Sequence, residues 1–145
     1  MNSLILPRAL AGAPRTIRDR GATVLLIACA LGALYACASS IGDVAAAGPA
    51  TQQVELWRLL GFAMFTGVFG LLAVWPRRYP GLWELVIVNK AALTIAEAVL
   101  IGNHAANAKS TAIADGILTV LLVAAYFLAR GWGSWNPGRM GRSPR

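Results

Sequence analysis

The chain has 145 residues, enough for one domain, and carries a formal net charge of +7. Hydrophobic residues make up 57% of it and charged residues only 13%, about half the charged share of a soluble domain. This composition argues against a soluble globular domain. The basic residues lie in the gaps between apolar runs, which is typical of a membrane protein, so we expect a lipid bilayer as partner and no nucleic acid. The excess of arginine over lysine, eleven to two, and the abundant alanine are typical of a GC-rich bacterial genome.

A basic N-terminal tail, residues 1–21, precedes a first apolar run over residues 22–41 that contains no charged side chain. A membrane-spanning helix needs roughly 20 mostly apolar residues, so this run predicts a first span. A basic leader before an apolar run also fits a signal peptide, and Leu26–Cys29 is similar to a lipoprotein cleavage motif. We favour an uncleaved span, because the apolar run continues for a dozen residues beyond Cys29.

Three further apolar runs follow, over residues 54–75, 82–102 and 111–129. The links between the runs are short, which forces neighbouring spans to run antiparallel. The predicted fold class is therefore all-α, an integral membrane four-helix bundle of up-down-up-down topology formed by a transmembrane domain over residues 22–130. The last segment, residues 131–145, is rich in glycine, proline and arginine and is predicted to be a basic, disordered C-terminal tail.

Lysine and arginine outside the runs are distributed unevenly. In a four-span arrangement, ten arginines fall on the side of the two termini and the link 76–81, whereas the other side has Lys109 alone. Because cytoplasmic segments hold the excess positive charge, we predict a multi-pass protein of the inner (plasma) membrane with both termini cytoplasmic. Aromatic residues that favour the membrane–water interface also lie near the run ends: Trp57, Trp75, Tyr79, Trp83 and Trp132.

Four ionisable residues inside the spans form the candidate polar cluster: Arg58, Lys90, Glu97 and Asp115. A charge at the bilayer centre costs about 2.5–3.5 kcal/mol on insertion scales, so each needs a partner or a wet cavity. At the helical rise, Arg58, Glu97 and Asp115 lie roughly 6–8 Å below the outer boundary. We therefore predict that Arg58 pairs with Glu97, Asp115 or both, since its planar guanidinium group can donate hydrogen bonds to two carboxylates. Lys90 lies roughly 18 Å below that boundary, near the midplane, with a stem long enough to approach the outer cluster.

Small residues recur every four positions in the first span, at Ala28, Gly32, Ala36 and Ser40. Such residues let helix backbones approach closely in lipid. The pattern predicts a contact with the second span or, alternatively, a face between two copies of the chain.

Several short features match a known group of membrane proteins: the segment Arg58–Gly61 opening the second span, Gly67 and Gly70 within it, Pro76 and Pro80 around the next link, and Lys90-Ala91 in the third span. With these features the chain resembles the DoxX-like small four-helix integral membrane proteins over roughly residues 22–130. The resemblance implies the same four-span fold, and most members of that group have no assigned function. The long basic leader departs from their pattern.

Catalytic sequence patterns are absent: the chain has no GxSxG, no HExxH and no glycine-rich phosphate loop. We therefore predict a non-enzymatic protein without metal or cofactor, acting as an accessory subunit or small-ligand binder with a buried polar cluster in the outer half of the bundle. Its expected protein partner is a second copy of the chain or a membrane complex. The alternative is a small proton- or cation-coupled transporter using Glu97, Lys90 and Asp115. A purely structural role of the buried charges stays open.

Overall fold

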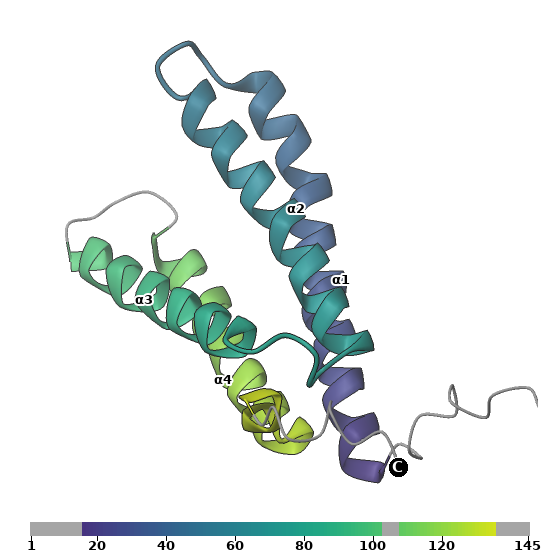
Figure 1. Cartoon of the computed structure of the whole chain (residues 1–145). Coiled ribbons are helices and arrows are strands. Elements are labelled where there is room, and N and C mark those ends of the chain that lie inside the picture. Colours follow the sequence, from purple (N-terminus) through teal and green to yellow (C-terminus); the bar gives the residue numbers. More distant parts are fainter. Residues whose placement is uncertain (1–15, 103–107, 136–145) are drawn as a thin grey trace, which may run out of the picture.

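A computed structural model describes residues 16–102 and 108–135. These residues form four α-helices and one short 3-10 helix: α1 (Ile17–Ala46), α2 (Gln52–Val74), α3 (Leu82–Gly102), α4 (Ala108–Ala129) and η1 (Gly131–Trp135). All four α-helices are long and apolar enough to cross a membrane. Successive helices run antiparallel (Figure 1), which confirms the predicted all-α four-span bundle.

The helix α1 extends five residues beyond each end of the predicted first span, 22–41. It begins at Ile17 because Thr16 and Asp19 form a reciprocal capping box. The Asp19 backbone N–H donates to Thr16 Oγ1 at 3.2 Å, and the Thr16 backbone N–H donates to the Asp19 carboxylate at 3.0 Å. At its other end α1 continues to Ala46, so Asp43 lies on the helix rather than in a link.

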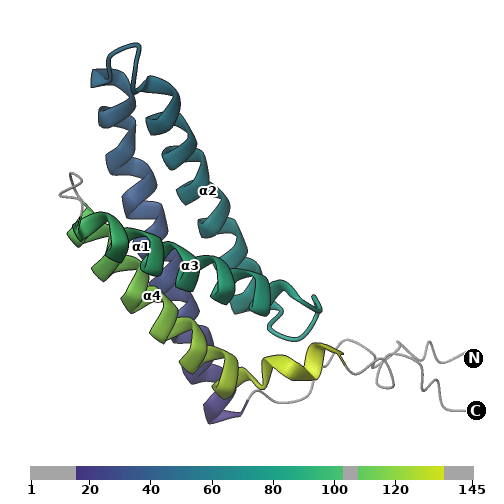
Figure 2. The ribbon, with the colours of Figure 1, turned by 90° about the vertical axis from the view of Figure 1, so that its left-hand side faces the viewer.

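The helices form two antiparallel hairpins, α1–α2 and α3–α4, which meet mainly through α1 and α4. Figures 1 and 2 show that the hairpins converge at the end of the bundle that holds the α2–α3 link and separate toward the opposite end. We call the first the basic end and the second, which holds the α1–α2 link, the far end. The basic end carries five of the described arginines: Arg18, Arg20, Arg77, Arg78 and Arg130.

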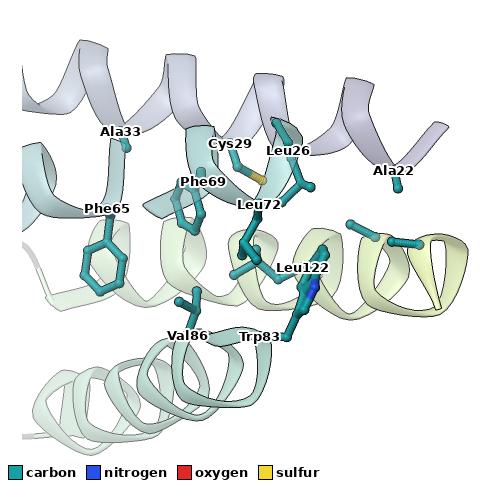
Figure 3. Packing of buried hydrophobic residues seen from close by; sticks show 13 residues of the cluster. Ala22, Leu26, Cys29, Ala33, Phe65, Phe69, Leu72, Trp83, Val86 and Leu122 are labelled. Atoms are coloured by element: carbon teal, nitrogen blue, oxygen red, sulfur yellow. The ribbon is translucent and has the colours of Figure 1, made fainter. Parts of the chain in front are cut away.

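The hydrophobic core occupies the half of the bundle nearest the basic end (Figure 3). Its largest fully buried side chains come from all four helices and are Leu26, Cys29, Phe69, Leu72, Trp83 and Leu122. Phe65 is the buried residue of α2 nearest the far end, and Lys90 holds the same position in α3. Beyond these two residues, none of the described side chains of α2 and α3 is buried. The core therefore joins the hairpins in one half of their length.

Trp83, which we predicted to lie near the membrane interface, is completely buried inside the bundle. Its indole Nε1 donates to the backbone oxygen of Pro76 at 2.7 Å, and its ring meets Tyr126 edge-on at a centroid distance of 5.8 Å. A buried indole needs such a hydrogen-bond partner. The other four aromatic residues of that prediction are exposed, at Trp57, Trp75, Tyr79 and Trp132.

The prediction of a disordered tail from residue 131 onward is wrong for its first five residues. Arg130 adopts a left-handed backbone conformation with φ of 53°, which ends α4 and turns the chain into η1. Trp135 of η1 donates its indole Nε1 to Glu84 Oε1 at 3.1 Å, so η1 is tied to the start of α3. The rest of that tail, residues 136–145, and residues 1–15 of the predicted N-terminal tail lie outside the described residues.

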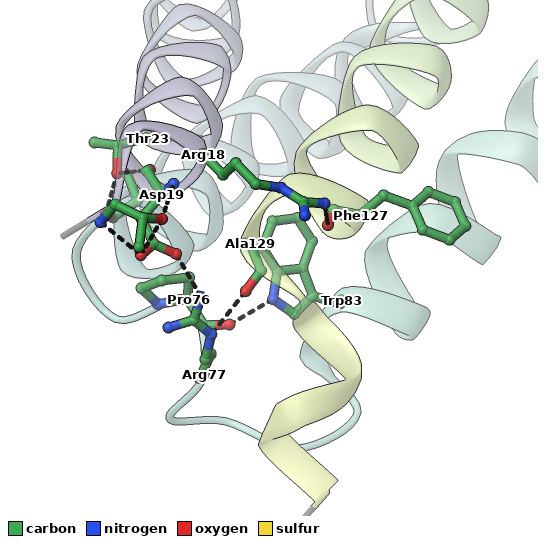
Figure 4. Close-up of polar contacts among 10 residues, drawn as sticks. Arg18, Asp19, Thr23, Pro76, Arg77, Trp83, Phe127 and Ala129 are labelled. Atoms are coloured by element: carbon green, nitrogen blue, oxygen red, sulfur yellow. Dashed lines mark hydrogen bonds and ion pairs between the residues drawn. The ribbon is translucent and has the colours of Figure 1, made fainter.

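The last carbonyls of α4 accept hydrogen bonds from arginines of other segments (Figure 4). Arg77, in the α2–α3 link, donates Nε to the Ala129 oxygen at 2.7 Å and also pairs with Asp19 of α1. Arg18 of α1 donates to the Phe127 oxygen at 3.5 Å. Positive charge at a helix C-terminus also complements the helix dipole. These contacts join α1, the α2–α3 link and α4 at the basic end.

The small residues of α1 pack differently from the prediction. Ser40 is buried and Ala36 half-buried, but Ala28 and Gly32 are exposed. The predicted contact of this stripe with the second span is therefore wrong for Ala28 and Gly32. In that half of the helix the buried small positions are Cys29 and Ala33, because α1 packs against α4 as well as α2 and its buried face is rotated accordingly.

Candidate functional site

Lys90 of α3 and Asp115 of α4 form an ion pair inside the bundle. Lys90 Nζ lies 2.8 Å from Asp115 Oδ1, and the two side chains are only 4% and 10% exposed. A buried charge without a partner is strongly destabilising. Lys90 and Asp115 can therefore be buried because each neutralises the charge of the other. Two members of the predicted cluster are thus brought together.

The ring of Phe65 covers the pair from the side of α2. Lys90 Nζ lies 4.1 Å from the ring centroid, which is a cation–π contact in a site withdrawn from water. The hydroxyl groups beside the pair do not bind it: Thr94 donates to the Lys90 backbone oxygen and Thr119 to that of Asp115, each at 2.8 Å. Sequence analysis did not single out Phe65, because an aromatic residue in an apolar span gives no signal of a cationic neighbour.

On the side of the basic end, apolar side chains close the pair off. Val86 lies one turn below Lys90 on α3, Phe69 one turn below Phe65 on α2, and Leu122 two turns below Asp115 on α4. All three are buried in the core cluster (Figure 3). A polar solute therefore has no open route from the pair toward the basic end in this conformation.

Arg58 does not pair with Glu97 or Asp115, so that prediction is wrong. Its Nη2 lies 3.0 Å from Asp43 Oδ2 and 2.5 Å from Glu55 Oε2. Asp43 was overlooked because the predicted first span ended at Ile41, whereas α1 continues to Ala46 and brings Asp43 opposite the start of α2. The Arg58 group is half-exposed and belongs to the far end of the α1–α2 hairpin.

Glu97 is half-buried and lies on α3, two turns from Lys90 toward the far end, a separation of about 10 Å along the axis. Within the part of the chain that the structure describes, no cation pairs with its carboxylate: Arg58 is bound by Asp43 and Glu55, and Lys90 by Asp115. The four members of the predicted cluster therefore divide into the closed, neutral Lys90–Asp115 pair, the separate Glu97 carboxylate, and Arg58, which pairs with Asp43 and Glu55.

An apolar groove of about 380 Å³ runs along α4. It is lined by Ala112, Ile113, Gly116, Ile117, Val120 and Leu121. Gly116 faces Thr94 of α3, since a Cβ atom on Gly116 would lie 3.5 Å from Thr94 Cγ2. Ala112 is one turn beyond Gly116 and Glu97 one turn beyond Thr94, so the groove and the carboxylate reach the same level of the antiparallel hairpin.

The charged groups of this half of the bundle, toward the far end, can bind ligands through their charge. Across residues 16–102 and 108–135, no three side chains of histidine, cysteine, aspartate or glutamate come together as a metal site would require. A single carboxylate at the level of an apolar groove can hold a proton or an organic cation. The buried pair can orient polar groups that reach it from the far end.

No family model matches the chain, and comparisons with curated proteins and with solved structures found no match. The resemblance to DoxX-like proteins is therefore still a prediction.

Proposed function

We propose that this protein is a non-enzymatic, multi-pass protein of the inner membrane that binds a small cationic ligand with an apolar body in the outer half of its bundle. The observation that carries this proposal is the Glu97 carboxylate, which has no ion-pair partner among the described residues and lies beyond the closed Lys90–Asp115 pair, at the level of the apolar groove of α4. The DoxX-like assignment and a bacterial origin are parts of the same proposal.

Charge at the far end favours a cation over an anion. The described charged side chains of this half are Arg58, Lys90 and Lys109 on the positive side and Asp43, Glu55, Glu97 and Asp115 on the negative side, an excess of one negative charge. Attraction between opposite charges is stronger at low dielectric constant than in water. A carboxylate at this depth is therefore stabilised by a cation that can itself enter an apolar groove.

The closed core favours a binder over the alternative, a proton- or cation-coupled transporter. Transport requires that the site opens in turn to both sides of the membrane. Here Val86, Phe69 and Leu122 close the basic side of the Lys90–Asp115 pair. The same residues Glu97, Lys90 and Asp115 would serve transport if a second conformation opened that side.

The excess of arginine at the basic end supports an orientation with both termini in the cytoplasm. We expect an alkaline phosphatase fused after residue 145 to be inactive in cells and one inserted in the α1–α2 link to be active. Phosphatase activity of the C-terminal fusion, without activity of the inserted one, would mean that the protein has the opposite orientation.

The proposed ligand site is tested with ethidium, a fluorescent lipophilic cation, and protein in lipid nanodiscs. The change Glu97→Gln is expected to weaken ethidium binding at least about tenfold, because it removes the charge that the cation would meet. The matched control is Glu55→Gln, whose carboxylate already pairs with Arg58 and whose loss should leave binding unchanged. Equal binding by the native protein and Glu97→Gln would refute the site.

Proteoliposomes separate the binder from the transporter. The binder is expected to retain ethidium without moving it when a pH gradient is imposed. Gradient-driven ethidium efflux that disappears in Glu97→Gln would favour the transporter instead.

A further inference from the structure

Asn89 of α3 is an exposed amide at the depth of the membrane interior. It lies about 10 Å along the helix from Leu82 and about 20 Å from Gly102, whereas the hydrocarbon core is roughly 30 Å thick. Its side chain has no hydrogen-bond partner among the described residues. An amide left unsatisfied in lipid is unfavourable, so this position points to a partner outside the single chain.

The exposed residues around Asn89 form one stripe on α3. Their spacings of four, three, four and three residues place them along a single face of the helix. The stripe consists of Leu85, Asn89, Ala92, Ala96 and Val99, all exposed. Lys90 is buried on another side of α3, where it meets Asp115, so the stripe itself carries no charge.

We infer that a second copy of this chain packs on the stripe, with α3 against α3. Copies in one membrane share one orientation, so a two-fold axis along the membrane normal brings each residue near the axis to its own counterpart at equal depth. Asn89 then meets Asn89 of the second copy, and each amide can both donate and accept. Ala92 and Ala96, one turn apart, allow the two backbones to approach closely.

The stripe suits a second copy better than a different protein, because its one polar group is self-complementary and no like charges face each other across the axis. The inference goes beyond the ligand site and does not depend on it. The competing face for a dimer is on α1, where Ala28 and Gly32 are also exposed and Tyr35, 76% exposed, adds a hydroxyl group. The Gly32→Leu variant in the test below distinguishes that face from the α3 stripe.

The test measures dimerisation in bilayers by single-molecule photobleaching over a range of protein-to-lipid ratios. The native chain is expected to dimerise, and Asn89→Leu to raise the dissociation constant about 5- to 30-fold. The change Ala92→Leu should also weaken the dimer by separating the backbones, and Asn89→Gln should retain part of the affinity. The matched control is Ala114→Leu, on an exposed position of α4, which should change nothing.

Crosslinking gives a second readout. In a chain with Cys29→Ala and Cys37→Ala, treated with copper phenanthroline and oxygen as the oxidant, the variant Ala96→Cys is expected to form a disulfide between copies, and Ala114→Cys is not. A monomer at every protein-to-lipid ratio would overturn the inference. So would a dimer that tolerates both Asn89→Leu and Ala92→Leu, or one that Gly32→Leu abolishes while those two variants leave it intact.

Discussion

Replacing Lys90 alone by methionine is expected to lower the free energy of unfolding by about 3–5 kcal/mol, because the change leaves Asp115 charged, buried and unpaired. Replacing both partners, Lys90→Met with Asp115→Leu, should recover most of that loss, because the double variant buries no charge. Unfolding of the purified protein in detergent micelles, followed by circular dichroism against added denaturing detergent, measures both variants.

The control is Arg58→Met at the half-exposed far-end group, which should cost less than about 1 kcal/mol. A loss in Lys90→Met no larger than this control would mean that the Lys90–Asp115 pair is solvated. The double variant also addresses function. If it folds normally but no longer binds ethidium, the pair contributes to the ligand site in addition to stability.

The change Gly131→Ala is expected to cost about 3 kcal/mol, a large effect for one methyl group. An added Cβ would overlap the ring of Tyr126 and lie 3.1 Å from Trp83 Cδ1. The Tyr126 ring has little room to retreat, because it packs edge-on against Trp83 and Trp132 and its hydroxyl donates to Glu84 Oε1 at 3.0 Å. Thermal unfolding in detergent measures the loss.

Gly133→Ala is the matched control, with the same change two residues away. Its added Cβ would lie 3.8 Å from Arg77 Cδ, an ordinary contact, so its melting temperature should stay near that of the native protein. Equal effects of the two substitutions would show that helical propensity of η1, rather than the contact with Tyr126, decides stability.

The four spans were predictable because lipid imposes a simple condition. A helix that crosses it must be apolar for about 20 residues, and the runs beginning at residues 22, 54, 82 and 111 meet that length. Helix ends were less predictable, because capping and tertiary contacts set them. The capping box of Thr16 and Asp19 starts α1 five residues before its apolar run, in a segment that charge alone assigns to the tail.

Helix ends and the angle between the hairpins explain the errors in the candidate site. The two hairpins separate toward the far end, so Asp115 meets Lys90 of its own hairpin rather than Arg58 of the other. The end of α1 at Ala46 likewise supplies Asp43 as the partner of Arg58. Inward orientation of Lys90 was predictable from the cost of a charge in lipid, whereas its partner depended on register between helices.

The arginines that donate hydrogen bonds to the last carbonyls of α4 make the two hairpins dependent on each other during biogenesis. A helix end leaves its final carbonyls without partners inside the helix. For α4 the donors are Arg18, at the start of the first hairpin, and Arg77, in the link that precedes the second. Both arginines are synthesised long before Phe127 and Ala129 leave the ribosome. The amino-terminal hairpin thus provides a template on which the last transmembrane segment docks, and the two halves are not autonomous modules.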